Sequence, residues 1–133
     1  MYLSELSNKQ KELFLDMCIS LSNVDNDFAS EEKRIIEELC DEMHITPKYE
    51  TTKSIEELLN EFDAISSFRE KRIAVIELLG IVMADKTIAK EEKEYMYKVL
   101  DTFKIKRSEL EDAFEMVKEL YVVYEKFAGF LNR

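Results

Sequence analysis

Apolar residues recur at three- and four-residue spacing through most of the chain, and this spacing predicts amphipathic helices. The first helix is expected over about 8–24. The second is expected to begin at Ser30 and to stop at 44–46, because Pro47 disfavours helical geometry in the residue before it. Two helices joined by a short polar turn therefore open the chain.

A serine followed three residues later by Glu or Gln marks further helix starts, because the two side chains can cap each other's backbone N–H groups. The pairs are Ser7 with Gln10, Ser54 with Glu57, Ser67 with Glu70, and Ser108 with Glu111. They predict a short helix through Phe62, a long one through Ala84 and a last one over about 109–131, while periodicity adds 90–103. The helix through Ala84 is apolar on nearly every face, which predicts a place in the middle of a bundle.

The chain also repeats itself with an offset of 60 residues. Over 25–45, seven residues are identical to those 60 positions later: Asp25, Ala29, Glu31, Glu32, Lys33, Asp41 and Ile45. The apolar positions of the helices before and after each turn also coincide at this offset of 60 residues. The sequence predicts an all-α fold, a compact bundle of about six to seven helices built from two pseudo-symmetric helix–acidic turn–helix repeats. The repeats span about 10–45 and 70–105, within one domain over 1–133.

Composition supports this class. The 133 residues include two glycines and one proline, too little turn material for a sandwich or barrel of short strands.

The net charge is −10, and residues 1–66 carry all of it, which disfavours binding to nucleic acid phosphates. The longest apolar stretch falls short of the roughly 20 residues that span a bilayer, and no secretory signal is visible. We expect no membrane insertion and a cytoplasmic location.

The repeat also predicts the state of the two cysteines. Cys18 and Cys40 align with Leu78 and Leu100, so each takes a position that the other repeat fills with a large apolar residue. Unpaired cysteine behaves as a small apolar residue. The sequence predicts two buried, free thiols.

The two acidic turns, 25–33 and 85–93, are the main candidate site. Carboxylates in a short loop suit a hard divalent cation, Ca²⁺ or Mg²⁺, although their spacing is not that of an EF-hand. The candidate metal ligands are Asp25, Asp27, Glu31, Glu32, Asp85, Glu91 and Glu92. Two alternatives stay open. The acids could simply stabilise helix starts, where the macrodipole favours negative charge, or they could form a surface for a protein partner.

One short pattern occurs twice in the chain. It consists of an apolar residue or Ala, then Asp, a turn, an apolar residue, and a Glu that opens the next helix. The better copy is Ala84, Asp85, Lys86, Thr87, Ile88 and Glu92; the poorer is Val24, Asp25, Asn26, Asp27, Phe28 and Glu32. Over about 10–105 the chain resembles the TerB-like tellurite-resistance family and the related N-terminal domain of DjlA-type membrane co-chaperones. The resemblance implies paired helical hairpins, no catalysis, metal-binding acids and a role in stress-response or phage-defence complexes. By position, Asp25, Glu32, Asp85 and Glu92 carry over.

Three features lie outside the turns. His44, the one histidine, is expected to end a helix. Glu77 is the one charge in the middle of an apolar helix, and its carboxylate is expected either to reach out to solvent or to form an ion pair. The last helix carries apolar residues around more than one face: Leu120, Tyr121, Val122, Val123, Tyr124, Phe127, Phe130 and Leu131. Either this helix packs across both hairpins, or part of it is left for a dimer or another partner.

These patterns predict a non-enzymatic, TerB-like module of stress-response or tellurite-resistance type, whose acidic turns bind a divalent cation or a protein partner. The alternative is a helical adaptor or dimerisation domain. In that case the turns are structural and the last helix is the working surface, in a homodimer for example. A third hypothesis, an enzyme that uses a carboxylate pair, requires a pocket around Glu77.

Overall fold

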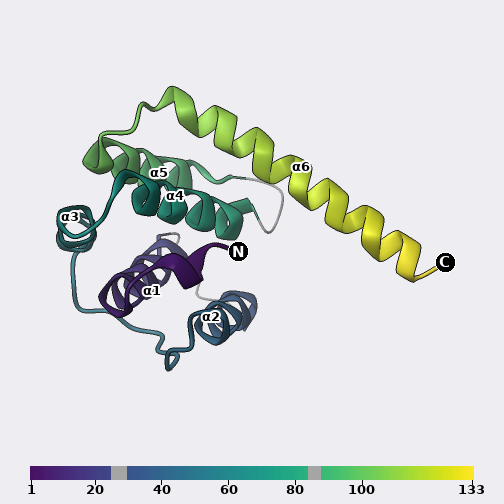
Figure 1. The fold of residues 1–133 in the computed structure, drawn as a ribbon, viewed down its shortest axis with the longest axis horizontal. Coiled ribbons are helices and arrows are strands. Elements are labelled where there is room, and N and C mark those ends of the chain that lie inside the picture. The colour runs from purple at the N-terminus through teal and green to yellow at the C-terminus, as the bar shows by residue number, and fades with distance from the viewer. Residues whose placement is uncertain (25–29, 84–87) are drawn as a thin grey trace.

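The computed structural model describes residues 1–24, 30–83 and 88–133, and in these ranges it contains six α-helices and one 3₁₀ turn (Figure 1). The elements are η1 (Leu3–Glu5), α1 (Asn8–Ser22), α2 (Ser30–Met43), α3 (Ile55–Ala64), α4 (Phe68–Val82), α5 (Lys90–Phe103) and α6 (Ser108–Leu131). The predicted all-α bundle is confirmed.

The two predicted repeats are present in the helix boundaries themselves. The first residues of α1 and α4 are 60 positions apart, as are their last residues, and the same holds for α2 and α5. Ser7 and Ser67 cap α1 and α4 with capping boxes, so the serine pattern located both starts correctly. Both helices end two residues earlier than predicted.

Helix α4 lies in the middle of the bundle, as its apolar character predicts, and packs against α1, α5, α6 and η1. Helix α3 packs against both α1 and α5. The rings of Phe62 on α3 and Phe103 on α5 have centroids 5.6 Å apart. One core therefore joins the two hairpins, with α3 fastened across both of them.

The N-terminal segment was not anticipated as part of the core. Leu3 and Leu6 are buried, and η1 packs against α2 and α4. Two apolar residues in so short a segment give no helical period that a sequence pattern can detect.

Helix α6 differs from its prediction at its start. Arg107, in helical geometry, precedes it, and no side chain caps this end. The predicted cap at Ser108 is therefore wrong. The first half of α6 lies along the bundle, and the second half projects beyond it to the C-terminus (Figure 1). Within the described ranges, no helix is both long enough and apolar enough to cross a membrane.

Candidate functional site

Most of the predicted metal ligands cannot be placed. Asp25, Asp27 and Asp85 lie outside the described residues, as do the side chains of Glu31 and Glu32. Elsewhere in the chain, the described His, Cys, Asp and Glu side chains form no group of three or more that could hold a metal ion.

The other two predicted ligands lie at the start of α5. Glu91 is exposed, and the Glu92 carboxylate accepts a hydrogen bond from the Ala89 N–H at 3.0 Å. This bond satisfies an N–H group that the helix start leaves without a partner. Glu92 thus stabilises the start of α5, which is the role that the acids of the turns have if they serve only as helix starts.

Both thiols are free and buried, as predicted, with 1% of Cys18 and of Cys40 exposed. Burial raises the pKa of each thiol above its usual value. A protonated, covered thiol is neither a good nucleophile nor a metal ligand. His44 is exposed and follows the last residue of α2, so it marks a helix end, also as predicted.

A single apolar stripe runs the length of α6, with alternating steps of three and four residues: Leu110, Ala113, Val117, Leu120, Tyr124, Phe127 and Leu131. The bundle covers its first half, since Leu110, Ala113 and Val117 are 3%, 6% and 5% exposed. Further along the helix, Tyr124, Phe127 and Leu131 are 47%, 59% and 78% exposed. The core-facing surface of α6 thus continues past the bundle, where none of the described residues covers it.

The exposed half of α6 is apolar on its other faces too. Of the twelve residues 120–131, only Glu125 and Lys126 are charged, and their charges cancel. Val122, Val123 and Phe130 are also exposed. A helix that is apolar all round is normally buried in a protein core or an assembly.

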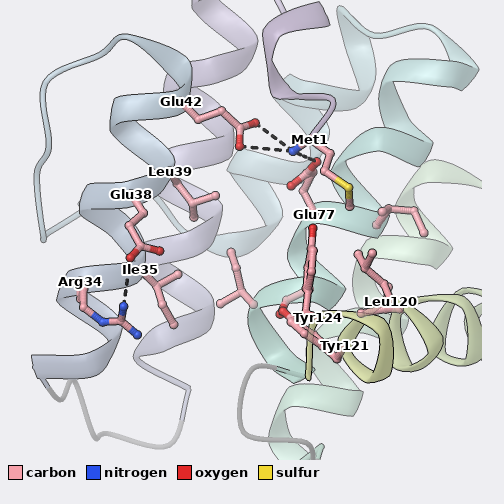
Figure 2. Close-up of a pocket in the computed structure, with 14 residues that line it drawn as sticks. Met1, Arg34, Ile35, Glu38, Leu39, Glu42, Glu77, Leu120, Tyr121 and Tyr124 are labelled. Carbon is pink, nitrogen blue, oxygen red and sulfur yellow. Dashed lines mark hydrogen bonds and ion pairs between the residues drawn. The ribbon is translucent and has the colours of Figure 1, made fainter. Parts of the chain in front are cut away.

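A groove of about 460 Å³ adjoins this surface, between α2, α4 and α6 (Figure 2). Ile35 and Leu39 of α2 line one wall, and Leu120, Tyr121 and Tyr124 of α6 line the other. These five side chains are apolar or aromatic. Two of them, Leu120 and Tyr124, also belong to the α6 stripe, so the groove adjoins the exposed helix directly. Arg34 and Glu38, which form an ion pair at 3.0 Å, also line the α2 wall (Figure 2).

Acidic side chains close one end of the groove. The Met1 amino group lies 3.0 Å from a carboxylate oxygen of Glu42 on α2 and 3.0 Å from one of Glu77 on α4 (Figure 2). The Tyr2 N–H also donates to Glu77, at 2.9 Å. Although burial lowers the pKa of the Met1 amine, the hydrogen bonds that the amine donates to Glu77 and Glu42 outweigh burial and raise that pKa. Glu77 is thus ion-paired, which is one of the two arrangements expected from the sequence.

Tyr121 fastens α6 to α4 beside the groove. Its hydroxyl donates to the Gly80 carbonyl at 2.6 Å, and burial raises the pKa of this hydroxyl. The bond holds the two helices together at the level where α6 begins to leave the bundle. The exposed half is therefore the extension of a firmly anchored helix.

Sequence reasoning missed the groove and the role of Glu42. The repeat held one usable signal, since Glu77 aligns with Met17, a fully buried residue. A charge at a position that the other repeat buries requires a partner nearby. That partner comes from residues 76 positions away, which no local pattern could identify.

A scan against protein-family models, a search of curated proteins and a search of solved structures each find no match to this chain. The resemblance to the TerB-like family stays a prediction.

Proposed function

We propose that this protein is a non-enzymatic dimerisation module in which the exposed half of α6, residues 120–131, pairs with the same helix of a second copy. The observation that carries the proposal is the α6 stripe, whose first three members are covered by the bundle and whose last three are not. Alternating steps of three and four residues are the spacing with which paired helices interlock their side chains.

The exposed area suits a stable interface. Aromatic side chains each bury about 150–250 Å², and Tyr124, Phe127 and Phe130 are 47–65% exposed. They therefore leave roughly 350 Å² per chain uncovered, or roughly 700 Å² for two copies. A standard interface buries about 1,200–2,000 Å² in total. Three aromatic residues thus supply about half of it, before the aliphatic side chains beside them are counted.

Charge favours a protein partner over a lipid surface. Helices that lie on membranes usually carry Lys and Arg on the polar face and gain from anionic lipids. Residues 120–131 have no net charge, and the protein as a whole carries −10. Anionic lipid would repel this chain. Two neutral helices, in contrast, can meet without cost from like charges.

The chemistry of the groove supports a function without catalysis. Glu77, the residue on which an enzyme would depend, has its carboxylate engaged by the Met1 amine and the Tyr2 N–H. Among the described residues, the groove lining includes no His, Cys or Ser, and the Tyr121 hydroxyl is committed to Gly80. Nothing in this set is poised to act as an activated nucleophile.

Analytical ultracentrifugation tests the proposal. We expect wild type to be dimeric, and the double variant Phe127→Glu with Phe130→Glu to weaken the dimer by at least about 100-fold, since central aromatic residues contribute about 2 kcal/mol or more each. Lys126→Glu is the matched control, because it changes the net charge by the same −2 at the same end of α6 but removes no apolar area.

The control should stay dimeric. A wild type that remains monomeric at high micromolar concentration would overturn the proposal, as would equal dimerisation of the double variant. Monomeric protein that binds neutral phospholipid vesicles through α6 would assign the exposed half to a membrane instead.

A further inference from the structure

The two repeats bury different amounts of equivalent helices. On α5, Tyr95 and Val99 are 5% and 0% exposed. Their counterparts 60 residues earlier on α2 are Ile35 and Leu39, which are only half-buried and line the groove. The same helix face is therefore covered in the second hairpin and open in the first.

The two hairpins also differ in the helix that packs across them. Helix α3 lies against both α1 and α5. By the repeat symmetry, the equivalent helix should lie against both α4 and α2. Helix α6 takes this place against α4, but the groove separates it from α2. The groove is thus the part of the symmetric arrangement that one chain leaves unfilled.

The C-terminal end of α6, residues 124–131 (the α6 tip), has the same spacing of apolar residues as α3, the helix that packs across the other hairpin. Helix α3 presents Ile55, Leu58, Leu59 and Phe62, at spacings of three, four and seven residues from the first. Leu58, Leu59 and Phe62 are fully or almost fully buried. Tyr124, Phe127, Ala128 and Leu131 have the same spacings on α6. Since α6 is one continuous helix that is fastened to α4, its tip cannot turn back into its own groove.

A second copy brings the tip to the right place. If two α6 helices pair antiparallel with Tyr124 opposite its own copy, a residue seven positions later lies about 10 Å beyond it, at the level of the residue seven positions earlier. Leu131 of one copy then lies at the level of Val117 of the other, and Phe127 lies at the level of Tyr121. Val117 and Tyr121 both line the groove.

We propose that the groove between α2, α4 and α6 is the docking site for the α6 tip of a second copy, so that each chain inserts Phe127 and Leu131 against Ile35 and Leu39 of the other. This inference rests on the proposed dimer and adds a second, reciprocal contact to it. Such a two-fold arrangement uses the same surfaces on both copies and closes on itself.

Disulfide trapping between variants that each carry one added cysteine tests the site. Leu39→Cys protein is mixed with Leu131→Cys protein of different mass and oxidised, so that a mixed disulfide can form only between chains. Tyr124→Cys alone reports α6 pairing at the two-fold axis. Both native thiols are buried and should not react in the folded protein. Lys98→Cys, at an exposed position on α5, is the matched control for chance collision.

We expect the Leu39–Leu131 pair to cross-link at least 10-fold more than the Lys98–Leu131 pair, and Tyr124→Cys to form covalent dimers. Cross-linking through Tyr124 without the Leu39–Leu131 product would overturn groove docking and leave the α6 dimer standing. No product from either would overturn both. The four substituted positions are at least partly exposed, and circular dichroism of each variant checks that it is folded.

Discussion

His44 and Lys104, 60 positions apart, have the same left-handed backbone conformation, with φ of 58° and 59°. Each follows the last residue of its helix. The next residue then donates its N–H backwards, from Ile45 to the Cys40 carbonyl at 3.0 Å and from Ile105 to the Leu100 carbonyl at 2.9 Å. This is the usual closure of a helix at a left-handed residue, normally glycine. The repeat thus extends to the geometry with which α2 and α5 end.

This geometry predicts that glycine stabilises both positions. A non-glycine residue in the left-handed region costs about 1–2 kcal/mol, and glycine loses part of that gain because its unfolded chain is more flexible. We expect His44→Gly and Lys104→Gly each to raise the free energy of unfolding by about 0.5–1 kcal/mol. Urea denaturation measures it. His44→Ala and Lys104→Ala are the controls and should change little; equal effects of Gly and Ala would contradict the strain argument.

The helix caps predict a contrast among four similar serines. Ser7, Ser54 and Ser67 each accept a backbone hydrogen bond at a helix start, whereas Ser108 lies inside α6 and caps nothing. Alanine at the three caps should cost about 1 kcal/mol each. Ser108→Ala should cost nothing, since alanine is the better helix former. Thermal denaturation of the four variants is the measurement, and a loss at Ser108 as large as at Ser67 would contradict the assignment.

The buried thiols predict slow labelling. Cys18 and Cys40 should react with a thiol reagent only when the core opens, so labelling in native buffer should be at least about 100-fold slower than in denaturant. Mass spectrometry without reductant counts the labelled thiols. An intramolecular disulfide, or rapid labelling of both residues in the folded protein, would show that the described core is wrong at this point.

The metal hypothesis for the acidic turns makes its own prediction. A cation that binds only the folded state, at a hundredfold excess over its Kd, adds about 2.7 kcal/mol and moves Tm by several degrees. The first turn should bind more tightly, because Thr87 replaces Asp27 in the second. Asp25→Asn with Glu32→Gln should therefore remove more of the shift than Asp85→Asn with Glu92→Gln.

The comparison for this prediction is Ca²⁺ or Mg²⁺ against monovalent salt at matched ionic strength, since screening alone helps a protein of net charge −10. No excess shift with millimolar divalent ion would leave the turns as helix starts, the role that Glu92 already has in α5.

Local patterns predicted the helices well because their starts depend on residues three positions apart. The same rule failed at Ser108, since the backbone of Arg107 is already helical and the serine falls inside the helix. Met1 and Tyr2, the partners of Glu77, were beyond reach because they lie 76 and 75 positions away. The apolar faces of α6 were evident in the sequence. Whether the bundle covers these faces depends on the direction in which α6 runs relative to the other helices, and the whole fold determines that direction.

The central claim is that residues 120–131 and the groove are covered together when two copies meet. Amide hydrogen exchange of wild-type protein, measured across a concentration series, tests it most directly. We predict that peptides covering 120–131 and 34–42 gain protection in parallel as the concentration rises, while those covering 90–103 stay unchanged. Exchange in 120–131 that is the same at low and high concentration would contradict the account.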